Sequence, residues 1–135
     1  MTFILAYIVT AVVFLAIDFV WLAYIMKDFF QNSIGHLMAD EPNLAVAAGF
    51  YILYAAGIVY FAIMPGLQNG SWMTVAFNAT FFGLLAYGTY EATNLATLKD
   101  WPVKMAIIDT AWGAALTATS ALAGYFAVQF FNSAS

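Results

Sequence analysis

Three carboxylic acids lie inside long apolar stretches of the sequence, at Asp18, Glu91 and Asp109. If these stretches are helices, the acids lie ~13, ~12 and ~7 Å along the axis from the lysine that ends or opens each stretch. All three are therefore expected near the same end of the molecule. An ionisable group among apolar side chains is costly unless it faces other polar groups or a wet cavity, so we expect the acids to converge in the interior.

These three carboxyl groups have no arginine to neutralise them, and the lysines lie at the ends of the stretches. Like-charged carboxylates in a low-dielectric site do not all ionise together, so they are expected to share a proton or to hold a cation. A shared proton suits proton coupling or general acid–base chemistry. The alternative is structural, with protonated acids and amides that join helices through hydrogen bonds.

Other kinds of chemistry find little support. Carboxylate and amide oxygens, including that of Asn94, suit hard divalent cations, but the residues do not follow a metal-ligand spacing, so no metal site is predicted. The sequence has no cysteine and a single histidine, His36, and it contains no Ser–His–acid or histidine-cluster signature. Catalytic residues and cofactors are therefore unassigned, and whether the protein is an enzyme stays open.

Polar and aromatic residues surround the acids at helical spacing. Tyr87 and Asn94 lie four residues before and three after the acid of the third stretch, with Tyr90 beside it. The other two acids are each followed three residues later by a tryptophan, which reflects either two antiparallel helices flanking one site or chance in a Trp-rich chain. The predicted ligand- or proton-binding residues are Asp18, Trp21, Tyr87, Tyr90, Glu91, Asn94, Asp109 and Trp112.

The amino-acid composition indicates whether the protein is surrounded by water or by a lipid bilayer. Of the 135 residues 65% are hydrophobic and only 7% are charged, against roughly 25% charged in soluble proteins. So few charges cannot cover a water-facing surface, which indicates a membrane protein. Three basic residues cannot neutralise many phosphates, so no nucleic-acid partner is expected.

Four apolar stretches, residues 3–26, 44–64, 72–98 and 103–131, carry the acids and their neighbours. A helix needs about 20 mostly apolar residues to cross a bilayer, so we predict an all-α membrane protein, a bundle of four transmembrane helices in one domain (1–135). A turn is expected between Pro65-Gly66 and Asn69-Gly70, and Ser71 is expected to cap the third stretch. The last stretch has a stripe of small or polar residues that lets helices approach closely, formed by Asp109, Gly113, Thr117, Ser120 and Gly124.

The first connection, residues 27–43, is long enough for structure of its own. Its apolar residues share one helical face, which predicts a short interfacial helix; they are Phe30, Ile34, Leu37 and Met38. Trp101, in the third connection, is assigned to the aromatic belt at the membrane surface, together with Trp21, Tyr24 and Trp72. All three lysines fall in or beside the first and third connections, so the positive-inside rule places these in the cytoplasm and both termini outside.

Five segments carry a resemblance to a known family: FLAIDFVWL (14–22), GHLMADEPNL (35–44), FYILYAAGIVYFA (50–62), AYGTYEATNLATLKDWP (86–102) and DTAWG (109–113). Together they are similar to a bacterial family of small inner-membrane proteins known as a domain of unknown function, over nearly the full length. The resemblance implies four transmembrane helices in a bacterial inner membrane, and no established activity. Many members have aspartate where this sequence has Glu91, which keeps the acid but lengthens its reach.

Three functions are compatible with these features. The leading hypothesis is proton-linked binding or transport of a small amphipathic or lipid-like molecule in an intramembrane acidic pocket walled by Trp21 and Trp112. The second is a non-catalytic subunit of a larger membrane complex, and the third is a membrane-embedded enzyme that modifies lipids. The expected partners are membrane lipids and a second copy of the chain, as a homodimer, or a larger membrane complex.

Overall fold

Helices make up nearly all of the computed structural model, which describes residues 2–37 and 43–134; no strand occurs within those ranges. In chain order the elements are α1 (Thr2–Val20), the π-helical turn η1 (Trp21–Ile25), α2 (Lys27–Ile34), the 3-10 turn η2 (Gly35–Leu37), α3 (Leu44–Ile58), the π-helical turn η3 (Val59–Ile63), α4 (Met64–Asn69), α5 (Trp72–Thr97) and α6 (Val103–Ala134). The π-helical turns continue their helices, so α1–η1 and α3–η3–α4 are each one long helix. The expected all-α architecture is confirmed.

Three helices are long and apolar enough to cross a membrane: Thr2–Ile25, Leu44–Asn69 and Val103–Asn132. α5 is also long enough, with 26 residues, but it is less apolar. Part of its polarity is satisfied within the helix, because the hydroxyls of Thr80 and Thr89 donate to the carbonyls four residues earlier. Such internal hydrogen bonds let a polar side chain face an apolar surrounding.

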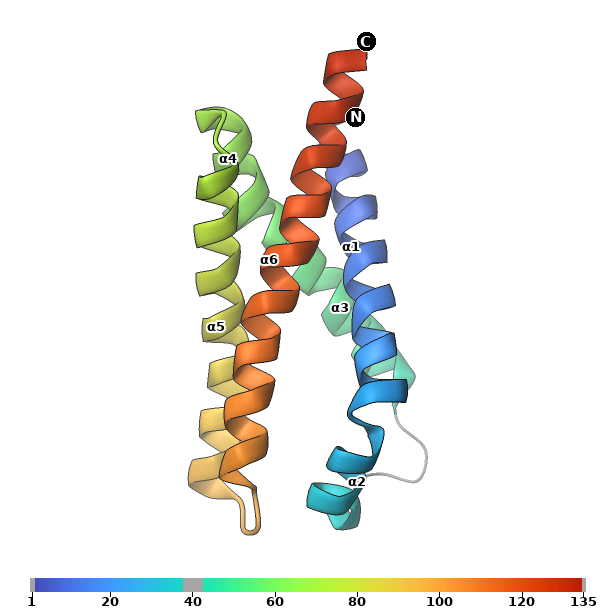
Figure 1. The fold of residues 1–135 in the computed structure, drawn as a ribbon, viewed down its shortest axis with the longest axis vertical. Coiled ribbons are helices and arrows are strands. Elements are labelled where there is room, and N and C mark those ends of the chain that lie inside the picture. The colour runs from blue at the N-terminus through green and yellow to red at the C-terminus, as the bar shows by residue number, and fades with distance from the viewer. Residues whose placement is uncertain (1, 38–42, 135) are drawn as a thin grey trace.

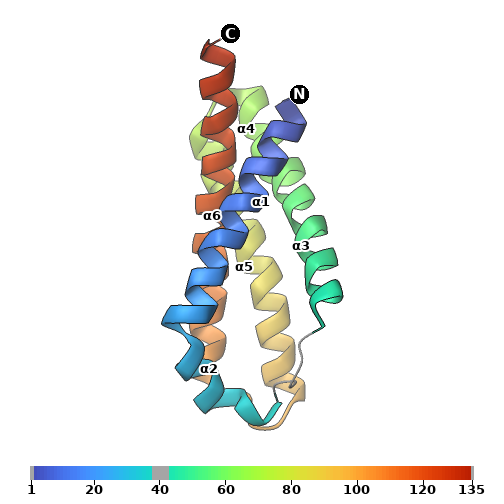
Figure 2. The ribbon, with the colours of Figure 1, turned by 90° about the vertical axis from the view of Figure 1, so that its right-hand side faces the viewer.

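α6 is the central helix of the bundle. α5 lies on one side of it and α1 on the other, while the helix α3–η3–α4 crosses behind (Figures 1 and 2). Both termini and the α4–α5 turn lie at one end of the bundle. The surface helix α2 and the α5–α6 turn lie at the opposite end (Figure 1). The acids of the first and third expected stretches are therefore carried by the two helices that flank α6, which itself carries the acid of the fourth stretch.

The helix of the second stretch does not end at Pro65, where a turn was predicted. It continues through α4, and the chain turns at Gly70, which has a left-handed φ of 65°. Proline lacks an N–H and disrupts the bond to the carbonyl four residues earlier. The π-helical turn η3 precedes it, and the side-chain amide of Asn78 on α5 donates to that carbonyl, on Phe61, at 3.1 Å. The lost helix bond is thus replaced, so the helix runs through Pro65-Gly66, and the chain turns only at Asn69-Gly70, the far end of the predicted turn, with Ser71 capping α5 as expected.

The predicted small-residue stripe on α6 contacts three other helices. A Cβ added at Gly113 would overlap a tyrosine ring of α5, and one at Gly124 would overlap the Thr10 hydroxyl of α1. Between them, Thr117 shares a hydrogen bond of 2.8 Å with the Tyr54 hydroxyl of α3. Close approach of helices through glycine and hydroxyl residues is typical of membrane bundles.

The first connection contains the expected short helix, α2. Phe29 and Ile34 pack against a small cluster at the start of α6, formed by Trp101, Met105 and Ala106. Leu37, predicted to lie on the packed face, is 50% exposed, while the side chains of Phe30 and Met38 lie outside the described part of the chain. The helix is present as predicted, and its contact is made by Ile34, from the predicted set, together with Phe29, which was not in that set.

A candidate intramembrane carboxylate site

Asp18 of α1 is buried, with 7% of its surface exposed. Its carboxylate accepts two hydrogen bonds, from the Tyr51 hydroxyl of α3 at 3.0 Å and from the Trp112 indole N–H of α6 at 3.3 Å. The Trp112 ring stacks on that of Trp21, with centroids 3.9 Å apart and planes 7° from parallel. One carboxylate thus joins three helices.

Glu91 of α5 is more deeply buried, at 2% exposure. Its carboxylate accepts a hydrogen bond of 2.9 Å from the indole N–H of Trp101. Trp101 is itself only 9% exposed, so the assignment of this residue to an aromatic belt at the membrane surface was wrong. The turn between α5 and α6 brings the indole back over the bundle, where the ring is covered by α2 and its N–H reaches the buried acid.

Asp109 of α6 connects the two buried acids. Its half-buried carboxyl lies within hydrogen-bonding reach of the Glu91 carboxyl and close enough to Asp18 for the two charges to interact. Two carboxyl groups form a hydrogen bond only when one of them holds a proton that it can donate. The three acids from α1, α5 and α6 therefore form one cluster, which we call the carboxylate cluster.

The remaining predicted site residues lie at different distances from this cluster. Tyr87 is close enough to Asp18 and Asp109 to interact with their charges, and its ring meets Tyr54 edge-on at 6.3 Å. Tyr90 is 54% exposed, lies close to the Asn94 side chain and meets the Trp101 ring edge-on at 5.9 Å. Tyr87 thus borders the cluster, whereas Tyr90 contacts the indole that donates to Glu91, and Asn94 lies beside Tyr90.

The repeated acid–tryptophan spacing places its two tryptophans in contact but does not give two equal halves. α1 and α6 run in opposite directions side by side (Figure 1), and Trp21 and Trp112 stack on each other. Trp112 donates to Asp18, but the buried Trp21 N–H has no partner in the described part of the chain. The two tryptophan rings are therefore arranged alike, but only the N–H of Trp112 donates a hydrogen bond to an acid.

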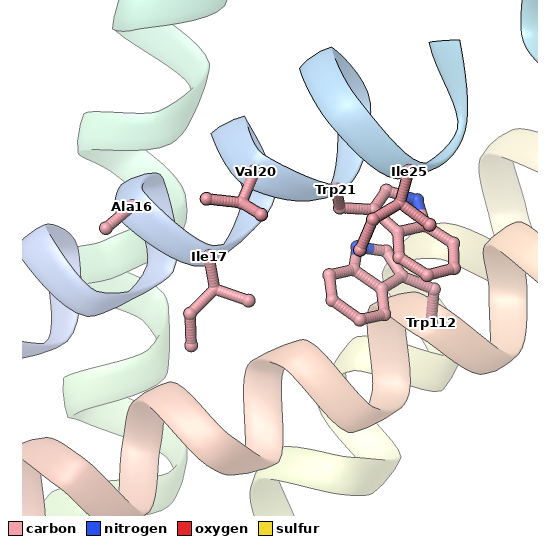
Figure 3. Close-up of a pocket in the computed structure, with 6 residues that line it drawn as sticks. All are labelled: Ala16, Ile17, Val20, Trp21, Ile25 and Trp112. Atoms are coloured by element: carbon pink, nitrogen blue, oxygen red, sulfur yellow. The ribbon is translucent and has the colours of Figure 1, made fainter. Parts of the chain in front are cut away.

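The Trp21–Trp112 pair lines a groove of about 400 Å³ between α1–η1 and α6 (Figure 3). Its other lining residues are apolar: Ala16, Ile17, Val20 and Ile25. No carboxylate lines this groove. A second groove, near the N-terminus between α1 and α4, is also without a carboxylate. Within the described residues, no group of three His, Cys, Asp or Glu side chains is arranged to hold a metal ion.

Sequence reasoning missed two of the hydrogen-bond donors. Trp101 has no helical relation to Glu91, since the turn separates them. Tyr51 lies on a helix with no charged residue, where an aromatic residue is explained equally by core packing and by the lining of an aromatic pocket. Two fully buried hydroxyls, Thr10 on α1 and Ser120 on α6, also lack a described partner; only Ser120 belongs to a stripe that the spacing had singled out.

The family is identified by its sequence model. Residues 3–126 match the family described as "Predicted membrane protein (DUF2177)", so the chain belongs to this family of predicted membrane proteins. No curated protein and no solved structure matches the chain at a significant level. Family membership agrees with the three candidate membrane spans, and the assignment of the predicted residues to ligand or proton binding stays a prediction.

Proposed function

We propose that this membrane protein binds a small amphipathic or lipid-like molecule and takes up or releases a proton as it does so. The observation that carries the proposal is the carboxylate cluster, in which acids from three helices meet in the interior of the bundle. The end of the bundle with α2 and the α5–α6 turn, which carries the lysines, is proposed to face the cytoplasm of a bacterial inner membrane, with both termini outside.

The hydrogen bonds of the cluster distinguish the three acids. Asp18 has two donors and Glu91 has an indole donor, whereas the partner described for Asp109 is another carboxyl group. An ionised carboxylate is stable in an apolar interior only when hydrogen bonds or opposite charges compensate for lost water. We therefore assign the exchangeable proton to the Asp109–Glu91 pair, with Asp18 ionised beside it.

Proton exchange on binding tests this function directly. Purified protein in weakly buffered detergent near neutral pH is mixed with lysophosphatidylglycerol, and a pH-indicator dye reports protons taken up or released. We expect about one proton per bound probe, since linkage requires exchange when binding alters protonation. Asp109→Asn should abolish the exchange, and Asp28→Asn, which removes an exposed carboxyl of α2, should retain it. Probe binding without proton exchange in the native chain would refute the proposal.

A second candidate function is a non-catalytic subunit of a larger membrane complex. It is favoured by the donors that Asp18 and Glu91 find within the chain and by the lack of carboxylates in the described grooves. In this case the cluster only joins helices. Asp109→Asn should then lower stability without any change in proton exchange, and the native protein should co-purify from membranes in stoichiometric amounts with a partner subunit.

A further inference from the structure

A line of hydroxyl groups leads away from the carboxylate cluster along α3 and α6. At the cluster, the Tyr51 hydroxyl donates to Asp18 at 3.0 Å. Tyr54 lies one helical turn further along α3, and its hydroxyl shares a hydrogen bond of 2.8 Å with Thr117 of α6. Ser120 follows Thr117 by three residues on α6 and is fully buried. Each of these groups is thus separated from the next by one hydrogen bond or by one helical turn.

Thr10 of α1 extends this line toward the end of the bundle that holds both termini. A Cβ added at Gly124, one turn beyond Ser120 on α6, would overlap the Thr10 hydroxyl. Thr10 and Ser120 are both fully buried, and neither hydroxyl has a partner within the described part of the chain. Ordered water commonly satisfies such groups, and side chains one helical turn apart are only ~5–6 Å from each other. Water is therefore expected to bridge these hydroxyls.

The second groove connects this line with the water at the end of the bundle that holds the termini (Figure 1). The groove has a volume of about 330 Å³. Thr2 and Gln68 give it exposed polar side chains, whereas Ala6 and Val59, which also line it, are fully buried. Ala6 precedes Thr10 by one turn of α1. The groove thus extends from the surface to within one helical turn of the last hydroxyl in the line.

We propose that these hydroxyls carry protons between the water at this end of the bundle and the carboxylate cluster. We call them the hydroxyl file; its members are Tyr51, Tyr54, Thr117, Ser120 and Thr10. A hydroxyl can donate and accept a hydrogen bond at once, so it can take a proton from one neighbour and pass its own to the next. Only O–H bonds form and break, and each hydroxyl is neutral again after the transfer. This inference rests on the proposed function, for which the file supplies the proton.

The donors at the cluster indicate where the file enters it. Glu91 accepts from the indole of Trp101, and Asp18 accepts from the indole of Trp112 and from the Tyr51 hydroxyl. An indole N–H donates but does not accept, so neither tryptophan can relay a proton. Tyr51 is the described donor that can do both. The proton therefore enters the cluster at Asp18, from the side of α3.

The rate at which deuterium replaces the proton of the carboxyl pair tests the file. The protein, in lipid nanodiscs that leave both faces open to the buffer, is mixed rapidly with D₂O. Time-resolved infrared spectroscopy follows the C=O stretch of the protonated carboxyl, which Asp109→Asn identifies. Ser120→Ala removes an unpaired buried hydroxyl, so the fold is retained. It should slow the exchange about tenfold, the effect of one hydrogen bond lost from the path. Thr10→Val, which keeps the branched shape, should slow it as well.

The matched control is Thr119→Val, which removes an exposed hydroxyl that donates to the Ala115 carbonyl of its own helix and should leave the rate unchanged. Equal rates in Ser120→Ala, Thr10→Val and Thr119→Val would overturn the inference and leave the proton-linked function intact. Faster exchange in Trp101→Phe, without an effect of the file variants, would overturn it in favour of entry from the α2 end. Slower exchange in the file variants, together with probe binding that moves no proton, would retain the file and refute the proton-linked function.

Discussion

Trp101→Phe is the substitution that most directly tests how a buried acid is held in this bundle. It removes the N–H that lies 2.9 Å from the Glu91 carboxylate while keeping an aromatic ring against α2. Glu91 is 2% exposed, so bulk water does not replace the lost donor. An unsatisfied buried acceptor costs about 1–3 kcal/mol, more if it is charged, and the smaller ring adds about 1 kcal/mol for the space it leaves. We expect a loss of about 2–4 kcal/mol.

Reversible unfolding in mixed micelles with increasing dodecyl sulfate, followed by circular dichroism of the helices, measures this loss. Trp72→Phe makes the same chemical change at a residue that is 51% exposed and should shift the free energy of unfolding by no more than about 0.5 kcal/mol. Equal effects of the two substitutions would refute the reasoning, because the buried hydrogen bond would then contribute nothing.

Repeating Trp101→Phe in a chain that already carries Glu91→Gln tests whether Glu91 is charged. In Glu91→Gln the indole N–H still has an oxygen acceptor, but the acceptor is neutral. Hydrogen bonds to charged groups contribute about 1.5–3 kcal/mol, and neutral ones about 1 kcal/mol. Trp101→Phe should therefore cost less in the Glu91→Gln background by about 1 kcal/mol. The same cost in both backgrounds would mean that Glu91 is neutral, and the proton of the pair would then be on Glu91 rather than on Asp109.

Two further predictions concern helix packing and the proline, and both are measured by the same unfolding assay. Gly113→Ala drives a methyl group into the Tyr87 ring and should destabilise the protein by about 1–3 kcal/mol, whereas Gly49→Ala, with nothing within 4 Å of the added methyl, should be neutral or stabilising by up to about 1 kcal/mol. Asn78→Leu removes the donor to the Phe61 carbonyl and should cost about 1–2 kcal/mol; an unchanged midpoint would show that this carbonyl finds another donor.

The meeting of the three acids was predictable because it depends on distances along helices. Apolar stretches of fixed length and a rise of 1.5 Å per residue put Asp18, Glu91 and Asp109 at one end, and the cost of exposing an acid to hydrocarbon turns each one inward. The cluster in the interior follows from these two rules. Neither rule gives the rotation of a helix or the side chain that meets each acid.

The features that the sequence did not predict depend on contacts between segments far apart in the chain. Pro65 is a strong turn signal by itself, and it stays in a helix because Asn78 of the next helix replaces the missing bond. Trp101 is typical of a membrane surface, and it is buried because the α5–α6 turn and α2 cover it. The hydrogen bond from Tyr51 to Asp18 likewise joins α3 to α1, and no spacing along either helix predicts it.

The surface helix α2 is connected to the buried acid Glu91 through the side chain of Trp101. Phe29 packs on the Trp101 cluster, and the Lys104 ammonium lies 6.0 Å from the Phe29 ring centroid. Trp101 in turn donates to Glu91, so this one side chain contacts both the surface helix and a buried acid. Because a hydrogen bond weakens steeply with distance and angle, a movement of α2 that shifts this ring acts first on Glu91. Asp18, in contrast, is held by donors from α3 and α6 and not from α2 or the α5–α6 turn.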